Sequence, residues 1–250
     1  MIPTPSPALP CGLLLALALF APAQAAPACS ARSAATITPV VELYTSEGCN
    51  SCPPADRWLS SLKADAPVVA LAFHVDYWDR LGWKDRFASP AYTRRQAEQQ
   101  RSSGARFSYT PQVLIDGADR TDWPAATPTA SRARPAATID AQLVRDGHRI
   151  TATITPLPGA PAHLAAYWAV TEQAHVSAVK VGENEGVMLH HDFVVRDYRP
   201  VSAWAAKAAG ATTLQFDLAG AGDPAHPRQV NLVLINADTG RPVQAVKLGC

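Results

Sequence analysis

The sequence predicts an α/β unit in the first half of the chain and a β-rich, sandwich-like unit in the second half. Strand and helix signals alternate from Val40 to Gly117, which is the pattern of an α/β unit. Beyond residue 138, short strand patterns are separated by turn residues, as in β-sandwiches. A stretch rich in Pro, Ala, Ser and Thr lies between them without periodicity. We therefore predict one domain over 36–122, a linker over 123–137 and a second domain over 138–250.

Five elements are predicted in the first half. Short apolar runs predict buried strands. One helix is predicted because apolar residues recur at helical spacing. The other is predicted because Ser-Pro precedes a polar run that ends at a Gly. In order, these are a strand over 40–46, a helix after Pro53 and Pro54, a strand over 66–73, a helix over 89–104 and a strand over 111–117. Because the helix over 89–104 is polar in its middle, we expect it to lie on the surface.

The second half is predicted to consist of strands. Asp146-Gly147 separates two alternating apolar and polar runs, which is a strong hairpin signal. Further strand-like alternation occurs in "HLAAYWAVTE", "HDFVVRDY", "TTLQFDL" and "VNLVLINADTGRPVQAVKL". Several short strands at this spacing favour a β-sandwich.

The composition is that of a neutral globular protein. Hydrophobic residues make up 48% of the chain, charged residues 17%, and the formal net charge is +1. Scattered charges of this kind provide no electrostatic surface for nucleic acid or for an anionic membrane. We predict no nucleic-acid partner, and no membrane association once the N-terminal signal is removed.

The N-terminus has the features of a secretory signal. Residues 12–21, "GLLLALALFA", form an apolar stretch with the length of a signal h-region, too short to span a bilayer. Ala23-Gln24-Ala25 offers a cleavage site. Residues 1–11 contain no Lys or Arg, so an uncleaved anchor or a mis-assigned start remains an alternative. We predict a signal peptide over 1–25 and a periplasmic or secreted mature chain.

Export would place four cysteines in an oxidising compartment. Cys11 leaves with the signal, and Cys29, Cys49, Cys52 and Cys250 remain, which allows three pairings. The short spacing favours a Cys49–Cys52 disulfide and leaves Cys29 to pair with Cys250. Free or intermolecular thiols at these two terminal cysteines are the alternative.

The stretch "YTSEGCNSCPPAD" (44–56) places two cysteines between a predicted strand and a predicted helix. A helix N-terminus favours the thiolate, which is the reactive form of cysteine. We expect Cys49 to be the exposed attacking thiol and Cys52 the more buried resolving thiol. This chemistry needs no cofactor.

A second motif, "YTPQVLIDG", sets Thr110 and Pro111 at the start of a strand. The order of predicted elements resembles the thioredoxin fold: a strand, C-x-x-C, a helix, a strand, a helix, and then Thr-Pro at the start of a strand. This resemblance implies that Pro111 is cis and packs against the disulfide, where it blocks close metal approach. It also implies that the Thr110 backbone pairs with a bound substrate chain.

The match is closer to one branch of that superfamily. Four stretches resemble a secreted bacterial thioredoxin-like family known as domain of unknown function twelve twenty-three. They are "VVELYTSEGCNSCPPAD", "FHVDYWDRLGWKDRFASP", "YTPQVLIDG" and "VGENEGVMLHHDFVVRDY". The resemblance covers nearly all of the mature chain. It implies an α/β thioredoxin-like N-terminal domain followed by a β-rich, sandwich-like C-terminal domain, together with export and disulfide chemistry. It supplies no substrate.

His74 and Asp76 follow the second predicted strand, and strand carboxyl ends are where sites form in open α/β sheets. If this strand and the one before the cysteines are parallel neighbours, either residue could reach the cysteines and tune proton transfer. In the alternative interpretation, Asp76 caps a turn and His74 is a hydrogen-bonded core histidine.

Two polar stretches of the second half remain. Adjacent strand residues point to opposite faces, so in "HHD" (190–192) only His190 and Asp192 could share a metal site. We interpret them as ordinary exposed strand residues and predict no metal site there. "GENEG" (182–186) reads as a polar loop, and its recurrence in the family implies contact with the first half.

The leading functional hypothesis is an exported thiol–disulfide oxidoreductase that acts on protein or small-molecule thiols and disulfides. One alternative is a metal-binding or metal-delivery protein that uses Cys49, Cys52 and His74, because thiolates with an imidazole suit Cu(I) or Zn. The other alternative is a non-catalytic envelope binding module in which the Cys49–Cys52 bridge is inert.

Overall fold

The computed structural model describes residues 1, 29–64, 67–103, 106–128, 134–206 and 210–250. The predicted signal peptide over 1–25 lies, apart from Met1, outside the described residues. Within them, no helix has the length and apolar character needed to cross a bilayer.

The first half contains the predicted elements. Its helices are α1 (Pro53–Ser61) and α2 (Pro90–Ser103), and its strands are β1 (Cys29–Arg32), β2 (Val40–Thr45), β3 (Val69–His74), β4 (Gln112–Ile115) and β5 (Ala118–Asp119). Pro53 and Pro54 occupy the first turn of α1, where a missing N–H leaves no hydrogen bond unmade. Before α2, the Ser89 hydroxyl accepts a hydrogen bond from the Ala91 N–H, as an N-cap does. Short 3-10 turns are η1 (Leu62–Ala64), η2 (Asp79–Leu81) and η3 (Trp123–Ala125).

The second half is built from strands, as predicted. They are β6 (Ile139–Asp146), β7 (Arg149–Pro156), β8 (His163–Glu172), β9 (His175–Ala178), β10 (Met188–His191), β11 (Val194–Ala205), β12 (Thr212–Asp217), β13 (Arg228–Asn236) and β14 (Pro242–Leu248). The predicted hairpin joins β6 and β7. Gly147 in its turn has a φ of +58°, a conformation that glycine adopts without steric cost.

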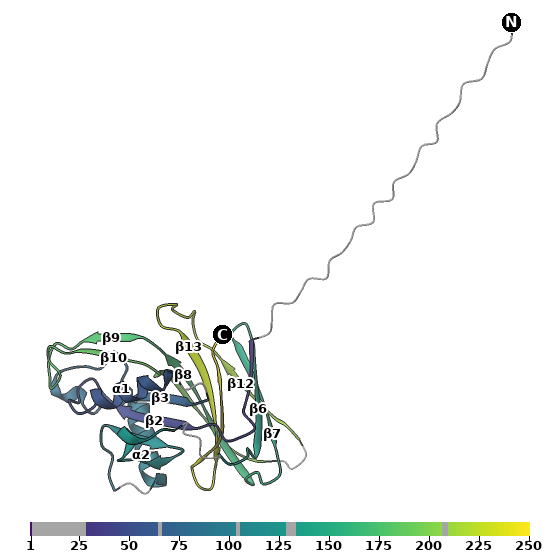
Figure 1. The fold of residues 1–250 in the computed structure, drawn as a ribbon, viewed down its shortest axis with the longest axis horizontal. Helices are drawn as coiled ribbons and strands as arrows, with labels where there is room; N and C mark the ends of the chain where they lie inside the picture. Colours follow the sequence, from purple (N-terminus) through teal and green to yellow (C-terminus); the bar gives the residue numbers. More distant parts are fainter. Residues whose placement is uncertain (2–28, 65–66, 104–105, 129–133, 207–209) are drawn as a thin grey trace.

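The predicted fold class is wrong, because the two halves do not form separate domains with separate sheets. Strands of both halves make one eight-stranded sheet in the order β14-β13-β8-β11-β3-β2-β4-β5. The junction is a parallel pairing of β11 with β3, where Val194 lies opposite Ala72. No separate α/β thioredoxin-like domain is present in the described chain. Figure 1 shows the strands of both halves side by side. Local patterns identified the strands but not their partners, and pairing with β11 fills the edge of β3 that an isolated α/β unit would leave open.

Within this sheet, β2 and β3 are parallel neighbours and β2 also pairs antiparallel with β4. Every residue of β2 and β3 is buried, because α1 packs over one face and α2 over the other. Leu43 and Ala72 pack with Leu59 of α1, whereas Tyr44 and Phe73 belong to the cluster that contains Tyr92 of α2. One face of α2 is therefore buried against the sheet, while the opposite face, with Arg94, Glu98 and Arg101, is exposed, as expected for a helix on the surface.

A second layer covers the other end of the large sheet. The four-stranded sheet β1-β6-β7-β12 packs on β8 and β13 through a cluster around Trp168, which stacks on Phe216. Cys29 of β1 forms a disulfide with Cys250 across a Cα–Cα distance of 6.0 Å. This bridge joins the four-stranded sheet to the segment that follows β14.

A buried ion pair lies under α2. Arg95 donates to the Glu42 carboxylate, and the Tyr167 hydroxyl donates to the same oxygen. Arg95 and Glu42 are 4% and 3% exposed. The Arg95 guanidinium also lies over the rings of Tyr167 and Tyr198, at 4.0 and 5.0 Å from their centroids. The charge of Glu42 is thus compensated inside the core.

A second carboxylate with several partners is Glu172, at the end of β8. It accepts from Arg228 at 2.8 Å and lies 3.0 Å from Nε2 of His175 and 3.4 Å from Arg196. Burial alone would raise the pKa of Glu172, but the hydrogen bonds from Arg228 and His175 hold it below its usual range.

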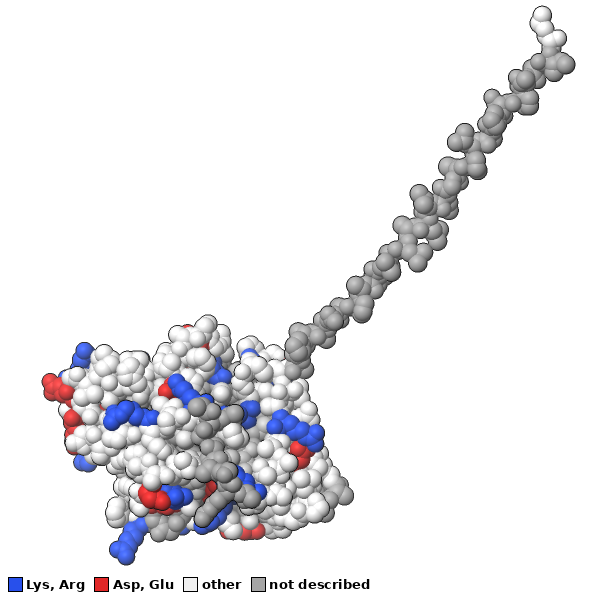
Figure 2. Space-filling view, in the orientation of Figure 1, with Lys and Arg blue, Asp and Glu red and all other residues white. Residues whose placement is uncertain are grey.

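The charged side chains of the surface are dispersed. On the face shown in Figure 2, Lys and Arg alternate with Asp and Glu among uncharged residues, and no large area carries one sign. This agrees with the formal net charge of +1.

Candidate functional site

The Cys49–Cys52 disulfide lies in the turn between β2 and α1, with a Cα–Cα distance of 5.4 Å. Cys52 is the N-cap residue of α1, so the bridge occupies the N-terminal end of a nine-residue helix. Gly48 allows this turn to approach the next segment, because a Cβ there would lie 3.0 Å from Cβ of Trp78. Neither cysteine has exposed surface, which contradicts the expectation that Cys49 is exposed.

Thr110 and Pro111 lie beside the bridge and are joined by a cis peptide bond. The Thr110 hydroxyl donates to Sγ of Cys49 at 3.3 Å. The indole N–H of Trp78 donates to the same hydroxyl oxygen at 2.7 Å, which leaves the hydroxyl proton free to face the sulfur. The Ser51 hydroxyl also lies 3.3 Å from this sulfur. Two hydroxyl groups therefore surround Cys49.

A loop of the second half covers the turn, as expected for "GENEG". The Asn184 amide donates to the carbonyl oxygens of Glu47 and Cys49 at 2.8 and 3.0 Å. The Glu183 carboxylate accepts from the backbone N–H of Asn50 at 3.1 Å. We call residues 182–186 the covering loop. Because Asn184 is 5% exposed, its two hydrogen bonds lie inside the protein.

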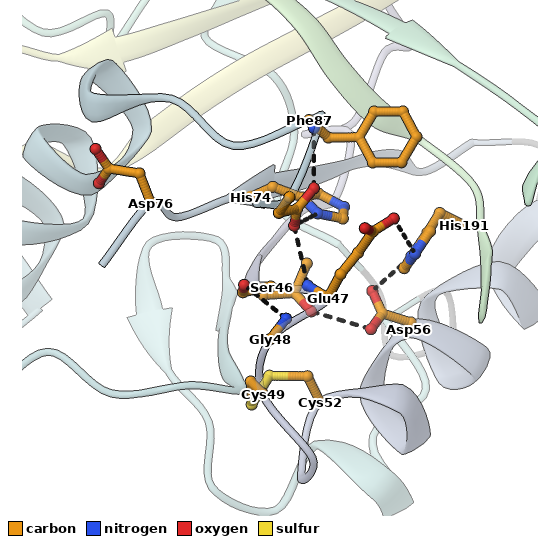
Figure 3. A network of polar contacts seen from close by, with 12 residues as sticks. Ser46, Glu47, Gly48, Cys49, Cys52, Asp56, His74, Asp76, Phe87 and His191 are labelled. Atoms are coloured by element: carbon orange, nitrogen blue, oxygen red, sulfur yellow. Dashed lines mark hydrogen bonds and ion pairs between the residues drawn. A yellow bond between two sulfur atoms is a disulfide. The ribbon is translucent and has the colours of Figure 1, made fainter. Parts of the chain in front are cut away.

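Beneath the disulfide lies a polar cluster, which we call the carboxylate–histidine cluster. It consists of Glu47, Asp56, His74, Asp85 and His191, all at most 6% exposed. Nδ1 of His74 lies 2.6 Å from Oδ2 of Asp85. The ring of His191 lies between two carboxylates, 3.4 Å from Glu47 and 3.7 Å from Asp56. Figure 3 shows this placement, with the sulfur pair on the other side of Ser46 and Gly48.

The carboxylates set the protonation of the cluster. Burial alone would lower the pKa of His191, but the interactions with Asp56 and Glu47 outweigh it and raise the pKa to about 10. Burial would raise the pKa of Glu47, yet its hydrogen bond with His191 lowers it. The pKa of Asp85 is also lowered, since the charge of His74 and two backbone N–H donors offset burial. Without another cation, His191 is therefore charged at neutral pH.

The structure separates His74 from Asp76. His74 points into the carboxylate–histidine cluster, and its described polar contact is with Asp85. Asp76 points away from the disulfide (Figure 3) and accepts from the Thr93 hydroxyl of α2. This contact joins Asp76 to α2 and gives no support to a role in proton transfer at the cysteines.

In "HHD" the buried residue is the middle one. His191 is 2% exposed, whereas His190 is exposed and Asp192 pairs with Lys63. The pairing of His190 with Asp192 in one site is therefore not seen. The signal in the sequence was the alternation of β10, because His191 shares its face with the apolar Leu189.

Other residues of the site also escaped sequence reasoning. Asp85, Trp78 and Asn184 lie in irregular segments, where no periodicity indicates which way a side chain points. Asp56 of α1 is 6% exposed and accepts from the Thr45 hydroxyl at 3.0 Å. The side chains that offer clustered metal ligands in the described chain are Asp56, His74 and His191. The two sulfur atoms are bonded to each other in this form.

Two solved structures resemble the whole fold. The crystal structure of protein AGR_C_4864 from Agrobacterium tumefaciens has 25% sequence identity and a TM-score of 0.62, over 85% of this chain and 94% of that one. HBP35 of Porphyromonas gingivalis has 16% identity and a TM-score of 0.61, over 87% of this chain and 76% of that one; this likeness concerns the fold alone. No curated protein matches the chain significantly.

The family model described as "Protein of unknown function (DUF1223)" matches residues 40–235. That range runs from the first residue of β2 nearly to the end of β13, and it contains the disulfide turn, Thr110, the covering loop and the carboxylate–histidine cluster. The chain belongs to the DUF1223 family.

Proposed function

We propose that this protein is exported and catalyses thiol–disulfide exchange with protein or small-molecule thiols through Cys49 and Cys52. The observation that carries the proposal is the disulfide at the N-terminal end of α1 with the Thr110 hydroxyl 3.3 Å from Sγ of Cys49. A helix N-terminus and hydroxyl donors both stabilise a thiolate. Export is supported by the N-terminal sequence and by two disulfides, which persist in oxidising compartments.

The exchange is a two-step transfer. A substrate thiolate attacks Sγ of Cys49, a bond forms between the two sulfurs, and the Cys49–Cys52 bond breaks. Its electron pair leaves on Cys52, which takes up a proton. The second substrate thiolate then attacks the mixed disulfide and releases Cys49. Two electrons pass from the substrate dithiol to the cysteine pair, and the reverse sequence reduces a substrate disulfide.

The polar groups near the bridge have distinct tasks in this scheme. The Thr110 hydroxyl, held by the Trp78 indole, donates to the Cys49 thiolate when it is released. We expect the covering loop to restrict access, because neither cysteine has exposed surface and Asn184 of this loop donates to the Cys49 carbonyl. Exchange therefore requires the covering loop to move away from Cys49.

The same burial favours a second candidate function, a non-catalytic envelope binding module whose disulfide is structural. The reduction potential of Cys49–Cys52 separates the two. The oxidised protein is equilibrated in graded glutathione buffers, alkylated, and the two disulfides are resolved by peptide mass. A potential above about −300 mV supports exchange, and one well below it marks a structural bridge. The Cys29–Cys250 disulfide of the same chain is the internal reference.

Turnover is tested with a fluorescent peptide dithiol. The wild-type chain should oxidise it, and Cys49→Ser should not. Cys52→Ser should accumulate a mixed disulfide between the peptide and Cys49, because the resolving thiol is missing. Thr110→Val should slow the reaction without removing it. A chain that meets the potential criterion yet never forms the mixed disulfide would contradict the proposal.

A further inference from the structure

Four buried polar atoms of the carboxylate–histidine cluster have no hydrogen-bond partner among the described residues. They are Nε2 of His74, both ring nitrogens of His191 and Oε1 of Glu47. His74 is 0% and His191 2% exposed, so bulk water does not satisfy these atoms. Buried polar atoms without partners are rare and destabilising. Nε2 of His191 and Oε1 of Glu47 lie 3.4 Å apart as an ion pair. Nε2 of His74 and Nδ1 of His191 remain, and these two ring nitrogens indicate that a further group belongs between them.

The negative charge of the cluster favours a cation in that place. Glu47, Asp56 and Asp85 are buried carboxylates, and within the described chain their ion-pair partners are the two histidines alone. Two imidazolium protons would offset two of three negative charges. A water molecule would offset none. A divalent cation with neutral imidazoles gives the same net charge as both protons and also engages the unpartnered ring nitrogens.

The hydrogen bonds around the cluster leave a free ligand atom on each of three residues. Asp85 is held by the backbone N–H groups of Glu47 and Phe87 and contacts Nδ1 of His74, so Nε2 of His74 points inward. The Thr45 hydroxyl occupies Oδ2 of Asp56 and leaves Oδ1. Metal-ligating histidines ordinarily donate their other ring N–H to a carboxylate, a backbone carbonyl or water. Asp85 and Glu47 lie in that position for His74 and His191.

These three residues come from different elements, α1, β3 and β10, and converge in Figure 3. One ligand atom from each lies within 4.8 Å of the others, and Oδ1 of Asp56 is 3.7 Å from Nδ1 of His191. Donor atoms of a tetrahedral zinc ion lie roughly 3.3–3.6 Å apart, which small rotations of these side chains would reach. We infer that Asp56, His74 and His191 bind one divalent transition-metal ion such as Zn²⁺.

The site is separate from the cysteine pair. Its ligands are two imidazoles and one carboxylate, a set suited to Zn²⁺ or Fe²⁺, and it requires neither sulfur. Because the ligands are buried, the ion enters as the chain folds or when the covering loop opens, and its binding energy adds to folding. The inference does not depend on thiol–disulfide exchange.

The test is zinc retention after refolding. The full chain, purified with its disulfides formed, is unfolded in guanidinium with a chelator and then refolded with or without Zn²⁺. After desalting, elemental analysis should find about one zinc per wild-type chain, and zinc should raise the unfolding temperature. His191→Asn should lose the ion, whereas His190→Asn, one residue away and exposed, should retain it.

Two further variants keep the outcome interpretable. The Cys49→Ser, Cys52→Ser double variant should retain zinc while losing exchange, so the two proposals can fail separately. If His191→Asn does not fold by circular dichroism, Asp56→Asn and a Co²⁺ titration of the wild-type chain replace it, since bound Co²⁺ absorbs visible light. A folded wild-type chain without stoichiometric Zn²⁺ and without Co²⁺ bands overturns the inference, as does equal retention by a folded His191→Asn chain.

Discussion

Replacing Asn184 with Ala tests whether the covering loop controls access to the disulfide. The Asn184 side chain donates to two buried carbonyls, those of Glu47 and Cys49. A neutral hydrogen bond contributes about 1 kcal/mol net, and a buried acceptor left alone costs about 1–3 kcal/mol. We therefore expect Asn184→Ala to lower the free energy of unfolding by about 2–4 kcal/mol.

The same change should expose the sulfurs. Neither Cys49 nor Cys52 has exposed surface, and in the proposed scheme a reductant reaches them when the covering loop opens. If the two hydrogen bonds of Asn184 hold the loop closed, losing about 2 kcal/mol of that stabilisation makes opening about 30-fold more frequent. Reduction of the Cys49–Cys52 bond by dithiothreitol should accelerate by that factor.

The assay combines urea unfolding with timed alkylation and peptide mass analysis. Asn231→Ala is the matched control, because Asn231 is 1% exposed and its amide donates to the Ala169 carbonyl and the Thr171 hydroxyl on β8. It should lower stability to a similar extent and leave the reduction rate near the wild-type value. Equal acceleration in both variants, or none in Asn184→Ala despite the expected destabilisation, would refute the gating role.

Three other changes have expected outcomes. Arg95→Ala leaves the Glu42 carboxylate buried without its partner and should cost about 3–5 kcal/mol in urea unfolding; an Arg95→Met, Glu42→Gln double variant that is no more stable than Arg95→Ala would contradict this explanation. Glu172→Gln should cost about 1–3 kcal/mol at neutral pH. Because the folded-state pKa of Glu172 is lowered, this stabilisation is present above the unfolded pKa of about 4.3 and is lost as pH falls through the folded value. The difference in unfolding midpoints between wild type and Glu172→Gln should therefore shrink toward zero at acidic pH. A difference that is independent of pH would contradict stabilisation by the ionised Glu172 carboxylate. Replacing Cys29 and Cys250 together with Ser should lower stability by about 2–5 kcal/mol, measured by thermal unfolding against a Cys49→Ser, Cys52→Ser chain.

The local elements could be predicted because their causes are local. The apolar run of β2, the prolines that open α1 and the Asp146-Gly147 turn each act over a few residues, and each element lies where it was predicted. The division into two fold units failed at β11. The sequence "HDFVVRDY" predicts a strand but contains no indication that Val194 pairs with Ala72 of β3, since any strand offers the same backbone donors and acceptors.

The sequence alone determined the cysteine pair, its place between a strand and a helix, and the proline that follows Thr110. Only the tertiary structure decided what surrounds them. It brought Asn184 over the disulfide from 135 residues away, and it placed His191 of β10 between Glu47 and Asp56. Periodicity shows that a side chain is buried, but not which residues it meets, because that depends on the pairing and packing of distant segments. The Cys49 sulfur, which was expected to be exposed, is therefore buried. The imidazole that lies between the Glu47 and Asp56 carboxylates is that of His191.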